Sequence, residues 1–247
     1  MDIDYFKVKI IADILWYISW WLAWFLFYKF YFKNSIQMGV FRNSEEKLFY
    51  YLWILGWAMF FAILISSFDN YISGYFAKNF WAWIVLSKTI AWAIAGWVIA
   101  SEIIKKIYKL KFNTWIVFVP SLIIWTIVWR IGAFNIWLRD NTHWIATNLA
   151  WWYDYWDWIL RHPAQIYEIL VLFLIWILLI LWLKYKKDFW LTNWFFIFCL
   201  VYFLYRFLAW FIMPYSHFWF GMNTIQIVSI GMIIYAIYKL KINYGKW

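Results

Sequence analysis

Five ionisable side chains lie within or at the ends of long apolar runs of this chain. They are Asp13, Lys88, Arg130, Glu168 and Arg206. An ionisable group at membrane depth is costly, so such residues are candidates for a functional site by default. Asp13 lies near the end of its run, where a structural role is the simpler interpretation. Lys88 fits a structural role and a functional role equally well.

Arg206 lies too deep in its run to be a simple terminal anchor, and Tyr202 precedes it by four residues, on the same helix face. A buried arginine beside a phenol could bind a phosphate or pair with Glu168. Arg130 ends a different apolar run, and two arginines from different helices could hold one phosphate, because the planar guanidinium matches phosphate oxygens in pairs. The phosphate most available to an intramembrane site is that of a lipid headgroup.

The densest polar cluster is the segment RHPAQIYE, which begins at Arg161. Pro163 suits the first turn of a helix, so Arg161 and His162 would lie at its mouth. Gln165 and Glu168 would then share one face and point into a helix bundle. A helix cap with interface-anchoring residues is the alternative. We favour a site, because a buried Glu168 requires partners.

The elements that position these residues are predicted to be transmembrane helices. Of the 247 residues, 68% are hydrophobic and 14% are charged, which excludes an ordinary soluble domain. A helix needs about 20 mostly apolar residues to cross a bilayer. The sequence therefore predicts a single all-α, polytopic membrane domain over 1–247, with about seven spans. The predicted spans are roughly 10–31, 48–68, 79–101, 112–130, 163–183, 189–213 and 218–238.

The basic residues predict the orientation of these spans. The net charge is +10, from 22 Lys and Arg against 12 Asp and Glu. Most of the basic residues fall in the links after the first, third and fifth spans and at the C-terminus. Cytoplasmic loops carry such an excess, so we expect the N-terminus outside, the C-terminus in the cytoplasm and an extracytoplasmic segment at 131–162. The charge thus fits a membrane surface, and no nucleic-acid partner is expected.

Little else in the sequence indicates chemistry. The acidic residues at the N-terminus favour a retained first span over a cleaved signal peptide. The single cysteine, Cys199, excludes a disulfide framework within the chain. The three histidines, His143, His162 and His217, show no metal-ligand spacing, so no metal is expected.

The segment RHPAQIYE, residues 161–168, resembles the signature of the prolipoprotein diacylglyceryl transferases, in which His-Pro-x-Gln-x-Tyr-Glu opens a membrane helix. Residues 120–134 resemble the family segment that leads into its Gly-Arg-Ile-Gly-Asn-Phe motif. Shorter matches occur in the family's order and cover most of the chain. They are Trp16 and Tyr17 in the first span, Tyr202 and Arg206 as its Tyr-x-x-x-Arg, and Gln226 and Ser229 as its Gln-x-x-Ser.

The resemblance implies a multi-pass enzyme of the bacterial cytoplasmic (inner) membrane that works without a cofactor. Such an enzyme moves the diacylglyceryl group of phosphatidylglycerol onto the lipobox cysteine thiol of a preprolipoprotein signal peptide. Membrane lipids and that peptide would be its partners. The expected catalytic residues are Arg130 and Arg206 on the phosphate, Tyr202 orienting it, and His162 and Glu168 as proton acceptors, with His143 a weaker candidate. The expected substrate-binding residues are Tyr17, Arg161, Gln165, Tyr167 and Gln226.

The chain departs from the family at several motif positions. Ala91 stands where the family has the histidine of a His-Gly-Gly motif, and Ala133 stands where it has an asparagine. Leu138 and Trp210 stand where it has acidic residues. A catalytically inactive homologue that binds phospholipid or lipoprotein signal peptides is therefore the second hypothesis. A small transporter is a weaker third, because the sequence shows no inverted repeat.

The chain has 26 Trp and only 8 Gly. Tryptophan stands where the family has glycine at positions 92, 125, 129, 137 and 190. Glycine at such positions permits close helix packing, and tryptophan there would overfill the site. We hypothesise that these residues are glycines encoded by UGA and read as tryptophan. UGG codons at all five positions would refute this hypothesis.

Overall fold

A computed structural model gives the fold of the chain. The structure describes residues 44–72, 89–109, 118–136, 145–150, 152–154, 157–185, 187–212 and 221–244, together with Ile14, Ile18 and Leu22. The predicted first span at 10–31 otherwise lies outside the described residues.

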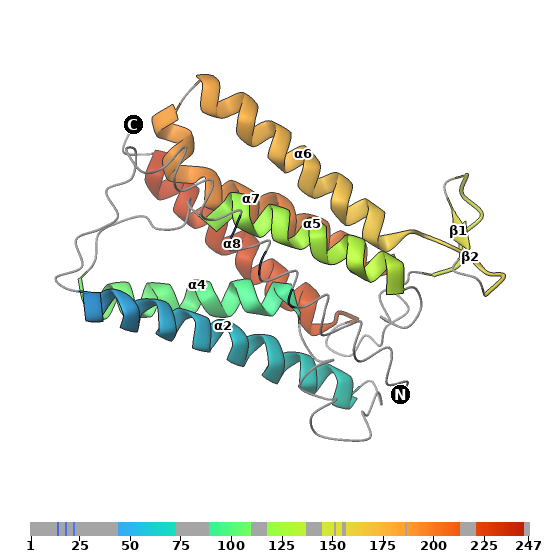
Figure 1. The fold of residues 1–247 in the computed structure, drawn as a ribbon, viewed down its shortest axis with the longest axis horizontal. Coiled ribbons are helices and arrows are strands. Elements are labelled where there is room, and N and C mark those ends of the chain that lie inside the picture. Colours follow the sequence, from blue (N-terminus) through green and yellow to red (C-terminus); the bar gives the residue numbers. More distant parts are fainter. Residues whose placement is uncertain are drawn as a thin grey trace.

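Six long helices and one short hairpin make up the described structure (Figure 1). The helices are α2 (Ser44–Ile72), α4 (Ile90–Ile107), α5 (Val119–Ile136), α6 (Ala164–Tyr185), α7 (Lys187–Ala209) and α8 (Thr224–Tyr244). A 3-10 turn, η4 (Trp210–Ile212), continues α7. The strands are β1 (Tyr153–Asp154) and β2 (Leu160–Arg161), which pair antiparallel.

Among the described helices, four contain stretches that are long and apolar enough to cross a membrane. These stretches are Leu48–Ile65, Ala164–Leu181, Thr192–Ile212 and Thr224–Tyr244. Large apolar side chains also lie exposed along the helices, as expected where a helix faces lipid rather than water. The prediction of an all-α membrane protein is therefore confirmed in this coarse form. The number of seven spans and the outward N-terminus stay predictions.

Several predicted boundaries differ from the structure, and the end of α5 is the one that bears on the candidate residues. Helix α5 continues to Ile136, so residues 131–136 are helical and do not belong to a loop. Arg130 consequently lies within α5 instead of at its end. The apolar sequence simply continues past Arg130, whose charge is compensated inside the protein. Helix α4 similarly extends to Ile107, past the predicted end at 101.

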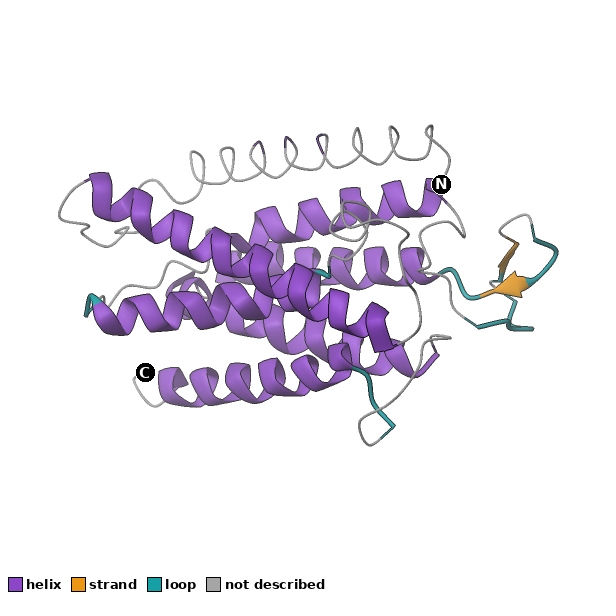
Figure 2. Cartoon of the chain, turned by 90° about the horizontal axis from the view of Figure 1, so that it is seen from below, coloured by secondary structure: helices purple, strands orange, loops and turns teal. Residues whose placement is uncertain are grey.

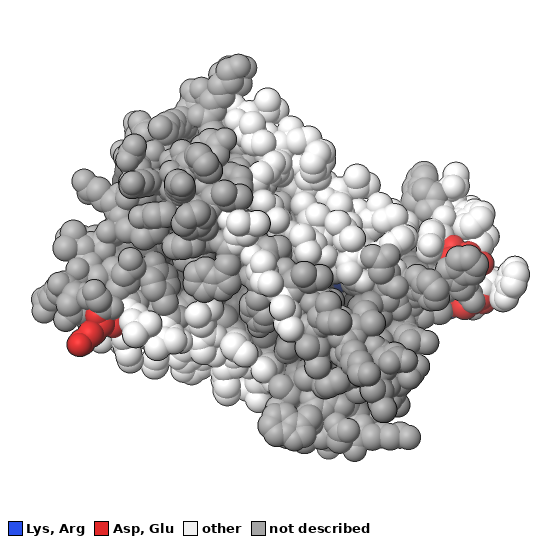
Figure 3. All heavy atoms as spheres, viewed as in Figure 1, with Lys and Arg blue, Asp and Glu red and all other residues white. Residues whose placement is uncertain are grey.

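Successive helices run in alternate directions, so their ends gather into two groups (Figure 1). At one end, Glu102 of α4 pairs with Lys239 of α8, with 2.8 Å between Oε2 and Nζ. The last turns of α4 and α8 add Lys105, Lys106 and Lys241 at this end. The hairpin extends beyond the bundle at the opposite end (Figure 2). On the face that Figure 3 shows, the acidic atoms of the described residues lie toward the two ends.

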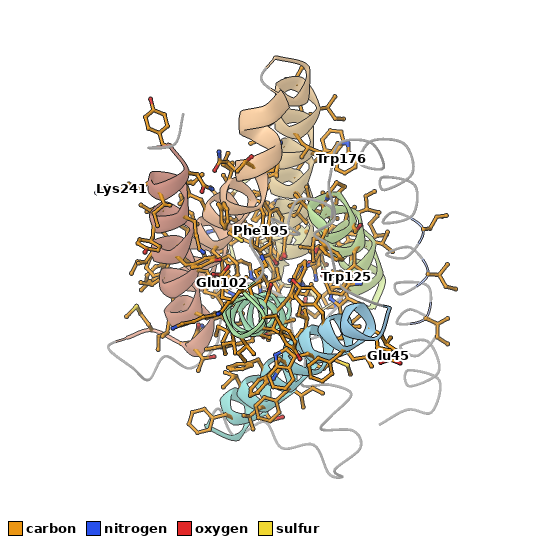
Figure 4. The ribbon with its side chains drawn as sticks, turned by 90° about the vertical axis from the view of Figure 1, so that its left-hand side faces the viewer. Glu45, Glu102, Trp125, Trp176, Phe195 and Lys241 are labelled. Carbon is orange, nitrogen blue, oxygen red and sulfur yellow. The ribbon has the colours of Figure 1, made fainter. Side chains whose placement is uncertain are left out.

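The main core lies between α4, α5, α6, α7 and α8, and Figure 4 shows Phe195 in the middle of the bundle. Helix α2 packs separately against α4. At Gly96, an added Cβ would lie 2.8 Å from both Phe61 Cβ and the Trp57 carbonyl oxygen, so this close approach requires glycine. A hydrogen bond of 3.0 Å between the hydroxyls of Tyr50 and Ser101 joins the same two helices nearer the end that carries the lysines of α4 and α8.

Candidate functional site

The candidate site is centred on Glu168, in the second turn of α6 at the hairpin end of the bundle. Helix α6 begins directly after His162 and Pro163, as the sequence predicts, and this start turns Gln165 and Glu168 inward. The two side chains belong to residues only 1% and 2% exposed. The prediction that they share a buried face is therefore confirmed.

Three side chains from the two neighbouring helices donate to the Glu168 carboxylate. Arg130 Nη2 of α5 lies 2.7 Å from Oε2, and Arg206 Nη1 of α7 lies 2.9 Å from the same oxygen. The hydroxyl of Tyr202 donates to Oε1 at 2.9 Å. Of the two roles considered for Arg206, the structure therefore shows pairing with Glu168. We call these four residues the Glu168 cluster.

The spacing of Tyr202 and Arg206 explains how α7 places two donors at the Glu168 carboxylate. One helical turn separates them, so both side chains reach the same carboxylate. The ring of Phe198, one turn before Tyr202, stacks on the phenol with 5.4 Å between centroids and 7° between planes. The Arg206 guanidinium carbon lies 5.8 Å from the centroid of the Trp210 ring, which is a cation–π distance.

The charges in the Glu168 cluster do not cancel. Two guanidinium groups oppose one carboxylate, which leaves an excess of one positive charge. All four residues are buried, and Arg130 at 7% is the most exposed of them. Interactions with an anion are strong where little water screens them. The cluster is thus a place where a second anion would be stabilised.

His162 lies just before α6, at the hairpin end of the bundle. Its Nδ1 is 3.0 Å from the hydroxyl of Tyr167. Burial lowers the pKa of His162 below its ordinary value of 6.5, so the imidazole is neutral at pH 7. A neutral imidazole can accept a proton, which is the property expected of a general base.

Arg161 is directed to the hairpin and not to the Glu168 cluster. Its Nη2 lies 2.6 Å from Oδ2 of Asp157. Asp154 Oδ1 closes the turn by accepting from the backbone N–H groups of Asp157 and Trp158. Desolvation opposes the charged form of Asp157, but the hydrogen bond and charge of Arg161 outweigh it and hold the pKa of Asp157 below its usual value. Trp158, at the tip, has a positive φ of 61° and is 93% exposed.

Gln226 lies in the first turn of α8, where it forms a reciprocal cap with Asn223. The backbone N–H of Asn223 donates to Gln226 Oε1 at 3.1 Å, and the backbone N–H of Gln226 donates to Asn223 Oδ1 at 2.9 Å. Our sequence interpretation missed Asn223. The signal was present, because a capping residue followed three positions later by Gln is the capping-box pattern.

Three of the motif departures, Ala91, Ala133 and Trp210, fall on described residues, and so do three of the five tryptophans that stand for glycine, at positions 92, 125 and 129. Ala91 and Ala133 are buried, at 0% and 3% exposed, so their methyl groups occupy interior positions. The indole N–H of Trp92 donates to the Thr224 hydroxyl at 3.2 Å, and its ring stacks on Phe61. Trp125 also packs against the main core. The described tryptophans are accommodated in this arrangement, which leaves the codon hypothesis to be tested on the gene.

The remaining candidates cannot be placed. Tyr17, His143 and Trp137 lie outside the described residues, as does the side chain of Trp190. The structure therefore brings together Arg130, Glu168, Tyr202 and Arg206, with His162 and Tyr167 paired at the start of α6.

In comparisons with known proteins, no protein-family profile matches this chain and no curated protein matches it.

Proposed function

We propose that this protein transfers the diacylglyceryl group of phosphatidylglycerol to the lipobox cysteine thiol of preprolipoproteins. The observation that carries the proposal is the Glu168 cluster, in which two buried arginines share one carboxylate among the described residues. Its excess positive charge suits a lipid phosphate that enters from the bilayer. The resemblance of RHPAQIYE to the transferase signature supplies the reaction, and the membrane-length helices supply the setting.

In the proposed reaction, the thiol sulfur attacks the carbon of the diacylglyceryl group that is ester-linked to the phosphate. A carbon–sulfur bond forms, the carbon–oxygen bond to phosphate breaks, and glycerol phosphate leaves with the bonding electrons. The thiol proton passes to a base, for which neutral His162 is the candidate outside the spans. Arg130 and Arg206 stabilise the charge of the leaving phosphate. Both oxygens of Glu168 already accept hydrogen bonds, so we assign it the positioning of the arginines instead of proton transfer.

The test uses the purified full chain with phosphatidylglycerol and a synthetic lipobox peptide, followed by mass spectrometry of the peptide. A second version of the chain carries glycine at every position that the gene encodes by UGA. The expected product is the peptide with one diacylglyceryl group on its cysteine. Arg206→Gln should abolish the product, and Lys106→Gln, at the opposite end of the bundle, should retain it. Absence of product from both folded versions would refute the proposal.

A second candidate function is binding without transfer. It is favoured by the buried methyl groups of Ala91 and Ala133, which stand where the resembled family has a histidine and an asparagine. In that case the Glu168 cluster would bind phospholipid or a lipoprotein signal peptide and release it unchanged. Lipid binding that depends on Arg206, without any peptide product, would distinguish this function from the transferase.

A further inference from the structure

Asn223 lies at the start of α8 with its side chain fixed by the reciprocal cap. It is 4% exposed, and its carbonyl oxygen accepts from Ile227 as the first intrahelical bond. Its Oδ1 must face the backbone N–H of Gln226, because a nitrogen cannot accept that bond. The orientation of the amide is therefore determined, and Nδ2 is held away from the helix end.

Asn223 Nδ2 is a buried donor without an acceptor in the described part of the chain, and so is Arg206 Nε. Leaving such a donor unsatisfied costs about 1–3 kcal/mol, and more for a charged group. The two donors come from neighbouring elements: Gln226 Nε2, in the turn that Asn223 caps, donates at 3.4 Å to the carbonyl of Phe207, the residue after Arg206. One unmet donor within the positive cluster and a second at the start of the adjoining helix α8 are the groups that an oxygen-rich ligand between α7 and α8 would satisfy.

We propose that the amide of Asn223 selects the lipid headgroup by donating to a hydroxyl oxygen of its glycerol. This inference rests on the proposed function, since it assumes that the phosphate of the same lipid lies at the Glu168 cluster. A glycerol headgroup offers oxygens that accept hydrogen bonds. An ethanolamine headgroup presents an ammonium, which only donates and which the excess positive charge repels. Both donors are shielded from solvent, so entry of the headgroup requires the side chains around them to move.

The discriminating variant is Asn223→Asp. Aspartate caps a helix as well as asparagine does, so Gln226 keeps its partner, while an acceptor replaces the unmet donor. Asn223→Ser also keeps a cap but removes the amide without adding charge. Asn243→Asp is the matched control, because it makes the same amide-to-carboxylate change at the far end of α8. There the Asn243 Nδ2 donates to Asn193 Oδ1.

The assay measures competition between phosphatidylglycerol and phosphatidylethanolamine for the full chain in bilayer discs, by mass spectrometry of the retained lipid. We expect the unmodified chain to prefer the glycerol headgroup and Asn223→Ser to lose about three- to tenfold of that preference, the equivalent of one neutral hydrogen bond. Asn223→Asp should lose more, and Asn243→Asp should lose none. Reaction of a thiol-specific dye with Cys199, which is fully buried, reports whether each variant is folded.

An unchanged preference in folded Asn223→Asp would overturn the inference, as would an unmodified chain that prefers neither headgroup. The failure of the proposed function is a separate result. It would be seen as a chain that prefers the glycerol headgroup, and loses that preference in Asn223→Asp, yet modifies no peptide. In that outcome the headgroup site stands and the transferase does not.

Discussion

Replacement of Glu168 by glutamine tests whether the Glu168 cluster is held together by its single carboxylate. Glu168→Gln keeps the shape of the side chain and its ability to accept from Tyr202. It removes the one negative charge, so the excess positive charge in the cluster rises from one to two. Arg130→Gln is the matched variant, because Glu168 then keeps Arg206 at 2.9 Å and the cluster becomes neutral.

The two substitutions should differ in their effect on the free energy of unfolding. Removing one partner of a buried ion pair costs about 3–5 kcal/mol, and we expect this full range for Glu168→Gln because two guanidinium groups lose their counterion. Arg130→Gln removes one charge-assisted hydrogen bond and leaves no excess charge, so about 1.5–3 kcal/mol is expected. For a chain of this size, 1 kcal/mol shifts the melting temperature by about 2–4 °C. Glu168→Gln should therefore lower the melting temperature by about 6–20 °C.

The assay uses the single cysteine of the chain. Cys199 is fully buried in α7, so a thiol-reactive fluorophore labels it only after the surrounding helices separate. Melting curves recorded this way in detergent compare the two variants with the unmodified chain. If Arg130→Gln melts at the same temperature as Glu168→Gln, or below it, the carboxylate is not the counterion on which the cluster depends, and the charge reasoning is refuted.

Two further predictions concern packing and pH. Gly96→Ala should destabilise the protein by about 1–3 kcal/mol, because its Cβ would overlap α2, whereas Gly231→Ala, with no atom within 4 Å of the added Cβ, should be neutral or slightly stabilising in the same melting assay. His162 has a lowered pKa in the folded protein, so below pH 6.5 the unfolded chain takes up a proton that the folded chain does not. The stabilisation by neutral His162 should thus be complete above pH 6.5 and decrease as the pH falls. Melting from pH 7.5 to 5.5 should then be less pH-dependent in His162→Gln, and equal pH dependence would contradict this.

Much of the candidate site follows from sequence because helix geometry converts spacing into position. Tyr202 and Arg206 are four positions apart, and Gln165 and Glu168 are three positions apart, so each pair shares a face of its helix. The high cost of a lone carboxylate inside a bundle then predicts that Glu168 finds partners, and deeply placed arginines are the available ones. The start of α6 likewise follows from Pro163, which is favoured in the first turn.

Tertiary contacts decide what the sequence leaves open. An arginine at the end of an apolar run indicates the membrane surface, and we accordingly predicted that the helix ends at Arg130. The contact with Glu168 offsets the cost of burying the Arg130 charge, and α5 continues to Ile136. The choice between a phosphate and Glu168 as the partner of Arg206 also depended on which helices are neighbours. Asn223 was missed for a different reason: the last span was predicted to begin at 218, so the helix start at Thr224 and its cap were not recognised.

The charged residues of the Glu168 cluster are not explained by a contribution to stability alone. Buried ion pairs contribute little net stability compared with apolar side chains of the same volume, and they often destabilise. If only packing were required, apolar residues could fill the space between α5, α6 and α7. Ile123, Leu172 and Phe203 fill the main core in this way. An excess positive charge is more costly still, unless an anion arrives to balance it. The second arginine therefore supports the proposed phosphate site, and the buried donors of Arg206 Nε and Asn223 Nδ2, which have no acceptor among the described residues, support the proposed headgroup contact.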